Sequence, residues 1–298
     1  MTKPQQDIWS QWLLHRRSGG DPQRLQAMLD SLRPIRDKVL SHANLGDGEI
    51  LLDVGCGDGL IAFGALEKSK VGKVILSDIS QDLLDRARSV AQEMEMMHRC
   101  QFLQASADVL SVLGDASVDA VTTRSVLIYV SAKQEAFNEF YRVLGPGGRL
   151  SIFEPINAYP YPETTPLPPG DDAVSIQELR EKVKAVYQRY QPEDTDPMLD
   201  FDERGLLAMA CQAGFEEVHL ELQVEIKPRT KGRDWETYLH SAPNPKAPTP
   251  TEAISEALTP VEAERYIAYL RPRVERKHGT TKLAGAFLWA VKHDSTQL

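Results

Sequence analysis

The chain has 298 residues, of which 34 are Lys or Arg and 43 are Asp or Glu, so its formal net charge is −9 at pH 7. A net acidic chain is a poor partner for phosphate backbones and anionic membranes, so neither nucleic acid nor a membrane is expected to bind it. Its length suits one large α/β domain with insertions, or a domain with a cap.

The three cysteines are far apart and form no C-x-x-C pair, which argues against a disulfide framework and against a zinc site; they are Cys56, Cys100 and Cys211. The first ten residues contain no apolar signal segment, and no apolar run approaches the length of a membrane span. We therefore expect a reduced, cytoplasmic protein with no metal site.

The N-terminal part is expected to be helical. Residues 7–20 are amphipathic and aromatic, which predicts a short helix that ends at a glycine pair. Asp21 and Pro22 have the pattern of a helix start, and Pro34 should break or kink the helix that follows.

From residue 49 onward, short apolar runs alternate with segments of helical spacing. Ser80 can cap one such helix, and Ser131 with Gln134 has capping-box spacing before another. This alternation predicts a parallel sheet with helices on both faces. The expected strands lie at residues 49–54, 73–76, 100–103, 118–122 and 149–153.

After Glu154 the composition changes, because two Pro-rich stretches interrupt the pattern at residues 155–170 and 242–250. Further helices are expected at residues 175–190, 202–213, 252–258 and 261–270, and further strands at 217–226 and 285–291. The division that these patterns predict is an N-terminal helical lid (1–45), a ligand-binding core (46–154), an insertion or cap (155–201), the core continued (202–227), a second insertion or cap (228–282), and a last core strand with a tail (283–298).

A glycine loop follows the first strand. The segment LLDVGCGDGL, residues 51–60, runs from an apolar strand through three glycines into a helix, and glycines allow a tight turn and close approach of a ligand. No Lys-Ser or Lys-Thr follows, and Leu60 stands where a dinucleotide fingerprint needs a third glycine. Asp53 precedes the glycines, and a carboxylate there suits a ligand with an ammonium group rather than a pyrophosphate.

An acidic residue, Asp78, ends the second strand about 20 residues beyond the glycine loop. An acid at that distance in a βαβ unit reaches ribose hydroxyls, although the same residue could merely cap the next helix. The loop and Asp78 together favour the binding of a ribose-containing ligand.

At this point the chain resembles the class I S-adenosylmethionine-dependent methyltransferases. The resemblance covers about residues 36–154 and rests on four segments in order: LLDVGCGDG (51–59), VILSDIS (74–80), VDAVTTRSVLIYV (118–130) and RVLGPGGRLSIFEP (142–155). It implies a seven-stranded, mostly parallel sheet whose last strand is antiparallel, N-terminal helices, and two insertions that form a cap. It also implies that S-adenosyl-L-methionine is the cofactor.

The resemblance implies roles for the residues of these segments. Gly55 and Gly57 would hold the methionine part of the cofactor, and Asp78, with Ile79 next to it, would hold the ribose. Where the family commonly has an Asp-Ala pair for the adenine, this chain has the segment QASAD, residues 104–108. If Ala107 corresponds to that Ala, Ser106 replaces the Asp. The adenine contact is therefore left open between Ser106 and Asp108.

The carboxyl edge of the sheet is the expected wall of the acceptor pocket, because ligands bind there in open α/β sheets. The candidates for catalysis or for contact with the acceptor are Arg124, Tyr129, Glu154 and Asn157 at that edge, and His15, with Trp9 and Trp12, in a lid. Arg124 also counts as a cofactor-binding candidate. Glu154 is expected to touch the nucleophilic end of the acceptor, the alternative being an ion pair with Arg124.

The expected function is methyl transfer to a nitrogen, oxygen or carbon atom of a small molecule. A methyltransferase for tRNA, DNA or protein is the alternative enzyme, which the acidic charge and the absence of a Pro-Pro-Tyr turn at residues 122–125 both disfavour. A non-catalytic cofactor-binding partner protein is the alternative from another class, which the intact glycine loop disfavours. The two insertions are expected to cover the carboxyl edge together or to form the contact of a homodimer.

Overall fold

The computed structural model describes residues 6–160, 173–230, 232–276 and 280–293. The Pro-rich segment expected at residues 155–170 lies largely outside this range. The chain divides into two compact units. One consists of Met1–Met28, Pro160–Asp196 and Glu225–Lys282, and the other of Leu29–Tyr159, Pro197–Val224 and Leu283–Leu298. We call them the helical unit and the sheet unit.

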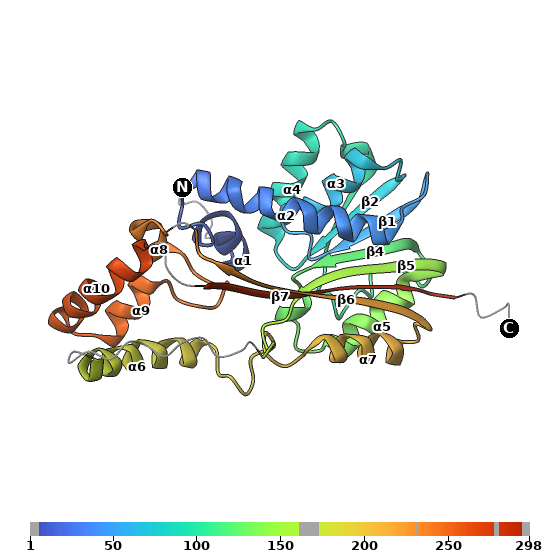
Figure 1. The fold of residues 1–298 in the computed structure, drawn as a ribbon. Coiled ribbons are helices and arrows are strands. Elements are labelled where there is room, and N and C mark those ends of the chain that lie inside the picture. Colours follow the sequence, from blue (N-terminus) through green and yellow to red (C-terminus); the bar gives the residue numbers. More distant parts are fainter. Residues whose placement is uncertain (1–5, 161–172, 231, 277–279, 294–298) are drawn as a thin grey trace. The chain divides into compact units, whose positions relative to one another are not determined.

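A seven-stranded sheet is the main feature of the fold (Figure 1), as expected. The strand order is β3-β2-β1-β4-β5-β7-β6, and β7 pairs with β5 in the antiparallel sense. The strands are β1 (Ile50–Val54), β2 (Lys73–Asp78), β3 (Cys100–Gln104), β4 (Val118–Arg124), β5 (Leu144–Pro155), β6 (Glu217–Pro228) and β7 (Thr280–Val291).

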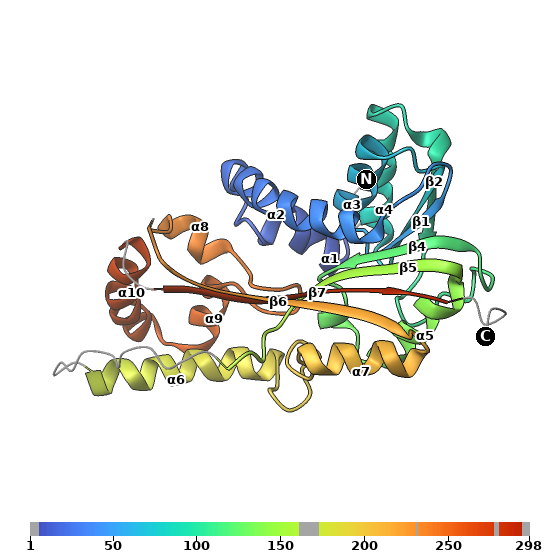
Figure 2. The same ribbon diagram turned by 45° about the vertical axis from the view of Figure 1, so that its right-hand side comes forward.

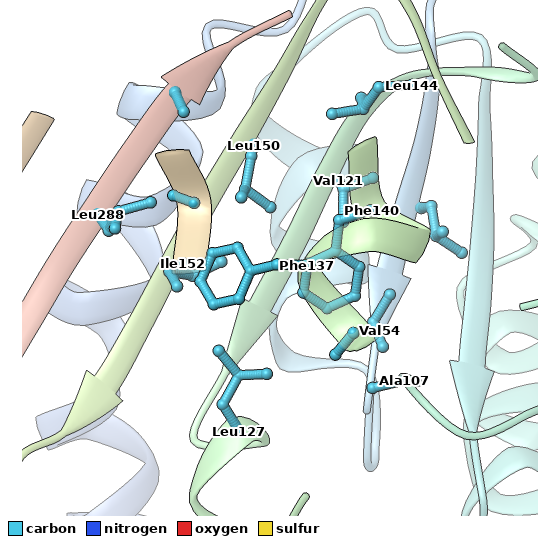
Figure 3. Packing of buried hydrophobic residues seen from close by; sticks show 14 of the residues in the cluster. Val54, Ala107, Val121, Leu127, Phe137, Phe140, Leu144, Leu150, Ile152 and Leu288 are labelled. Carbon is cyan, nitrogen blue, oxygen red and sulfur yellow. The ribbon is translucent and has the colours of Figure 1, made fainter. Parts of the chain in front are cut away.

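Helices cover both faces of this sheet, because successive residues of each strand point to opposite sides. Leu52 and Val54 of β1 face the helices α5 (Lys133–Val143) and α7 (Glu203–Ala213), whereas Leu51 faces α3 (Leu60–Lys68) and α4 (Gln81–Glu93). Figure 1 shows α5 and α7 below the sheet and α3 and α4 above it. Phe137 and Phe140 of α5 are fully buried against the strands (Figure 3).

The helical unit has a core of its own. Its helices α6 (Ala173–Tyr190), α8 (Trp235–His240), α9 (Pro250–Ala257) and α10 (Pro260–Glu275) lie together (Figure 2). Thr249 and Thr259 begin α9 and α10 with complete capping boxes, each followed by a proline in the first turn. The N-terminal α1 (Ile8–Gln11) and the π-helical turn η1 (Trp12–Arg16) also belong to this unit.

Three local predictions need correction. Pro34 was expected to break or kink its helix, and the break does not occur, because α2 (Pro22–Ala43) continues through Pro34. Ser131 does not cap α5, because the cap position is held by Ala132, which makes no side-chain bond to the helix. The strand expected at residues 149–153 begins earlier, ahead of residues 145–148. They belong to β5 and bulge out of its pairing with β4, in which Val118 opposes Leu144 and Ala120 opposes Arg149.

Candidate functional site

The glycine loop joins β1 to α3. Gly55, Gly57 and Gly59 have φ angles of 62°, 57° and 92°, in the left-handed region where other residues are strained. A Cβ atom on Gly55 would lie 2.3 Å from Cγ2 of Val126, so this position also leaves no room for a side chain. The backbone of the loop therefore takes a shape that only glycine permits, and it rests on the segment that follows β4.

Asp78 lies beside the glycine loop because β1 and β2 are parallel neighbours, with Val54 opposite Ser77. The Gly57 N–H donates to Oδ2 of Asp78 at 2.8 Å, and the Ser80 N–H donates to Oδ1 at 2.9 Å. The side chain is 7% exposed, and the next residue, Ile79, is 45% exposed. The structure thus brings together the acid and the loop that the sequence linked, with an exposed apolar side chain next to them.

The segment after β3 joins the same edge. The Ala105 N–H donates to the Asp78 carbonyl at 3.1 Å, and the hydroxyl of Ser106 donates to the carboxylate of Asp108. Ser106 and Asp108 are half-buried, whereas Ala107 is buried in the hydrophobic core. The two candidates that the sequence left open therefore lie together as a hydrogen-bonded pair, and the side chain of Ala107 points away from the edge.

Asp53 lies beneath the glycine loop and not within reach of a ligand. Its side chain is 1% exposed, and its carboxylate accepts bonds from the Ala62 N–H (3.1 Å) and the Thr122 hydroxyl (3.0 Å). Burial raises the pKa of Asp53 to about 7. The expected direct contact of Asp53 with an ammonium group is thus corrected: this carboxylate ties β1 to α3 and β4 and supports the loop from below.

Arg124 ends β4 at the same edge and is half-buried. Its Nη1 donates to the Ser125 hydroxyl at 3.3 Å. Burial lowers the pKa of Arg124, while three nearby carboxylates, led by that of Asp58 in the glycine loop, oppose this shift. Sequence reasoning missed Asp58, although its place inside the loop was the available signal.

Glu154 has a different task from the one that the sequence predicted. Its side chain is 0% exposed, and its carboxylate accepts the backbone N–H groups of residues 126–128 at 2.9, 3.0 and 3.3 Å. Burial raises the pKa of Glu154 to about 7. No atom of this carboxyl group faces open space, so the expected contact with an acceptor is wrong. No ion pair with Arg124 forms among the described residues either.

The remaining candidates are spread over the two units. Tyr129 belongs to the short 3₁₀ turn η3 (Leu127–Tyr129), close enough to Arg124 to influence it electrostatically, and Asn157 is exposed after β5. His15, with Trp9 and Trp12, belongs to the helical unit, where the Trp12 indole donates to the Ala242 carbonyl at 3.0 Å. The lid role of His15 therefore stays a prediction.

The described part of the chain bears on two further features, a metal site and a membrane span. Within it, no group of three or more His, Cys, Asp and Glu side chains is arranged to hold a metal ion. In the same ranges no helix combines the length and apolar character that crossing a bilayer requires.

Known proteins are similar to this chain in sequence. Residues 52–152 match the family model described as "Methyltransferase domain". The ubiquinone/menaquinone biosynthesis C-methyltransferase UbiE of Escherichia fergusonii is 32% identical over 177 residues, which cover 57% of this chain and 68% of that protein. This chain belongs to the class I S-adenosylmethionine-dependent methyltransferases. It is therefore an enzyme, and its methyl donor is S-adenosyl-L-methionine.

Solved structures share the methyltransferase fold at low identity. The YcgJ protein from Bacillus subtilis has a TM-score of 0.57 at 16% identity, over 87% of this chain and 98% of that one. Phosphoethanolamine N-methyltransferase 2 from Haemonchus contortus, solved in complex with S-adenosyl-L-methionine, has a TM-score of 0.53 at 16% identity, over 96% of this chain and 57% of that one. At such identities the likeness concerns the fold.

The residues present at the carboxyl edge fit this cofactor. S-adenosylmethionine carries a positive sulfonium and a positive ammonium group, and the carboxylates of Asp58 and Asp78 lie in or beside the glycine loop. The left-handed Gly55 and Gly57 have no side chain, which allows close approach of a ligand to their backbone. A cationic ligand with a ribose therefore meets complementary charge and shape here.

Proposed function

We propose that this methyltransferase transfers the methyl group to a small molecule bound at the carboxyl edge of its sheet. A hollow of about 590 Å³ supports the proposal. Ser131 follows β4, Ala158 follows β5, and Gly205 lies in the first turn of α7, so the lining residues gather at that edge. Pockets for small ligands and cofactors occupy roughly 300–1,000 Å³, so the hollow has a suitable size.

The net charge of −9 and the acids of the hollow also favour this proposal over a nucleic-acid substrate. Asp200 and Asp202 line the hollow, together with Lys133, which pairs with Asp200, and the apolar side chains of Leu199, Phe201 and Met209. An acceptor with an apolar body and a hydrogen-bond donor or a positive charge would match them. Carbon joins nitrogen and oxygen as an acceptor atom to test, because the Escherichia relative is named as a C-methyltransferase.

We assign cofactor contacts on the same basis. Asp78 accepts the ribose hydroxyls, Ile79 covers the adenine ring, and Ser106 with Asp108 binds its polar edge. The backbone at Gly55 and Gly57 holds the methionine part. Arg124 donates to the methionine carboxylate, because its guanidinium is half-buried at this edge and has, among the described residues, one hydrogen bond of 3.3 Å.

Methyl transfer depends mainly on alignment of the methyl group with the acceptor atom. S-adenosylmethionine supplies a methyl group that is already activated by the sulfonium. The protein must hold the acceptor in line with that methyl group and exclude water, and a base is required only for an acceptor that must lose a proton. Tyr129 on η3 is the candidate for such proton handling, and Tyr129→Phe should lower turnover without changing cofactor affinity.

The experiment is transfer of a labelled methyl group into a cell extract that has been separated into small molecules, RNA and protein. We expect label in the small-molecule fraction, dependent on the enzyme and lost in the Asp78→Ala variant. Label that appears in RNA or protein but not among small molecules would contradict the proposal.

A further inference from the structure

Two buried charges hold the ends of the segment that follows β4. At its beginning the Glu154 carboxylate accepts the three N–H groups of residues 126–128. At its end the Lys133 ammonium donates to the Val130 carbonyl at 2.8 Å. Glu154 is 0% exposed and Lys133 is 5% exposed. The segment 126–130, which contains η3, is thus fixed at both ends by groups that water does not reach.

The signs of these charges match the dipole of the turn. A helical turn has a partial positive charge at its N–H end and a partial negative charge at its carbonyl end, so an anion and a cation at these respective ends stabilise it. Hydrogen bonds to charged groups are also about twice as strong as neutral ones. Because Glu154 belongs to β5, the neighbour of β4, its bonds attach the turn to the sheet itself.

The segment 126–130 contacts the glycine loop and is preceded by a residue with strained backbone. Val126 lies so close to Gly55 that a Cβ there would sit 2.3 Å from it. Ser125, just before the segment, has φ of 57°, in the left-handed region where a residue other than glycine is strained. Surrounding contacts must maintain such a conformation, and the Ser125 N–H donates to the Phe153 carbonyl, next to Glu154, at 2.8 Å.

We propose that Glu154 and Lys133 are positioning residues for cofactor binding: they clamp the segment 126–130 so that Val126 supports Gly55 and Arg124 faces the cofactor. The proposal rests on the cofactor contacts assigned above. Neither side chain contacts the cofactor in this role, although Lys133 also lines the hollow proposed for the acceptor. Their effect reaches the site through the backbone of the segment between them.

Lys133 has two further bonds, which make a matched comparison available. Its ammonium also donates to the Pro197 carbonyl at 2.9 Å and pairs with Asp200 at 2.5 Å, where the chain re-enters the sheet unit. Asp200→Asn weakens that ion pair and leaves the bond to Val130 in place. Lys133→Met removes all three bonds, so a loss seen in Lys133→Met and not in Asp200→Asn comes from the bonds to the two carbonyls rather than from the ion pair.

The experiment compares variants for cofactor affinity at a temperature where each is fully folded. Glu154→Gln should weaken S-adenosylhomocysteine binding at least tenfold, measured by calorimetry, and Lys133→Met at least fivefold. The control Glu49→Gln removes a carboxylate that accepts the Gly46 N–H at 2.7 Å at the opposite edge of the sheet. It should lower the melting temperature but change affinity less than twofold, as should Asp200→Asn.

Amide exchange tests the clamp without any ligand. In peptides that cover residues 126–130, exchange should be slow in the wild type and at least tenfold faster in Glu154→Gln, with no change in Glu49→Gln. Unchanged exchange, or affinity within twofold of wild type in a folded Glu154→Gln protein, would overturn the proposal. Should that variant fail to fold, Lys133→Met decides by the same two readings. A wild type that does not bind S-adenosylhomocysteine would refute the cofactor contacts instead, while exchange would still test the clamp.

Discussion

Asp78 and Glu154 begin from the same situation, since each lies at the carboxyl end of a parallel strand and accepts N–H groups from the loop of a neighbouring strand. Asp78 receives one N–H from the glycine loop and is 7% exposed. Glu154 receives three from residues 126–128 and is 0% exposed. The carboxyl edge of the sheet therefore does not by itself give an acid a ligand to bind. The neighbouring loop decides how much of the carboxylate remains available.

The shapes of the two loops explain this difference. The glycine loop has left-handed residues at positions 55, 57 and 59, which spread its N–H groups in different directions. The η3 turn is helical, so its first N–H groups point the same way and have no partner within the turn. One carboxylate can satisfy all of them. The part of the edge at β1 and β2 thus leaves the Asp78 carboxylate partly exposed. The part at β4 and β5 encloses the Glu154 carboxylate completely.

The largest effect on stability is expected at Gly55, where the glycine loop contacts Val126. Gly55→Ala should destabilise the protein by about 3 kcal/mol, because the residue has φ of 62° and its Cβ would meet Val126. The matched control is Gly147→Ala, with φ of 73° but open space around the Cβ, which should cost about 1 kcal/mol. Urea unfolding measures both. Equal losses would show that Val126 does not support the loop.

The next effect concerns pH and involves the buried acids of both parts of the edge. Burial raises the pKa of Asp53 and of Glu154 to about 7. Between pH 4.5 and 7 the folded protein keeps protons that the unfolded chain releases, so the free energy of unfolding falls as pH rises through this range. We expect a loss of about 1 kcal/mol per carboxyl group from pH 6 to pH 8 in the ligand-free protein.

Urea unfolding at pH 6, 7 and 8 measures this loss. In Glu154→Gln the loss of unfolding free energy that Glu154 contributes should be absent. The difference between the pH dependence of wild type and of this variant therefore separates Glu154 from His42, whose pKa burial lowers. Stability that rises from pH 6 to pH 8 to the same extent in both proteins would contradict the assignment.

Removal of Asp78 should act on binding more than on folding. Asp78→Ala is expected to weaken the affinity for S-adenosylmethionine more than tenfold, because the ribose loses a charged acceptor and Gly57 loses the acceptor of its N–H. Asp85→Ala, on the exposed face of α4 where Asp85 pairs with Arg88, is the control and should leave affinity unchanged. Calorimetry that finds the same affinity in both variants would remove the ribose assignment.

The smallest effect is expected at Arg124. Arg124→Met should weaken the binding of S-adenosylhomocysteine about fivefold, since one charge-assisted pair with the methionine carboxylate is lost. The binding of 5′-methylthioadenosine, which lacks that carboxylate, should change less than twofold. Equal losses for the two ligands would mean that Arg124 supports the fold of the edge rather than the methionine end.

Local signals account for the predictions that the structure confirms. The strands at residues 49–54, 73–76, 100–103 and 285–291 were readable, because buried strands are short apolar runs bounded by turn residues. The antiparallel direction of the last strand came from the family resemblance. Ser80 caps α4 as predicted, with the Leu83 N–H donating to its hydroxyl at 3.1 Å. The continuity of α2 through Pro34 did not follow from local rules; after the proline, Ile35 and Val39 pack in a hydrophobic cluster.

The sequence by itself determined the glycine loop and Asp78, because positive φ angles and the length of a βαβ unit are requirements of contiguous residues. It also determined the family, through four ordered motifs. Only the tertiary structure decided which groups the carboxylates of Asp53 and Glu154 bind. The partners of Glu154 lie 26 to 28 residues earlier in the chain and meet it only because β4 and β5 are neighbours. A buried carboxylate takes whatever donors the neighbouring backbone presents, and that depends on packing between strands, which a local pattern does not contain.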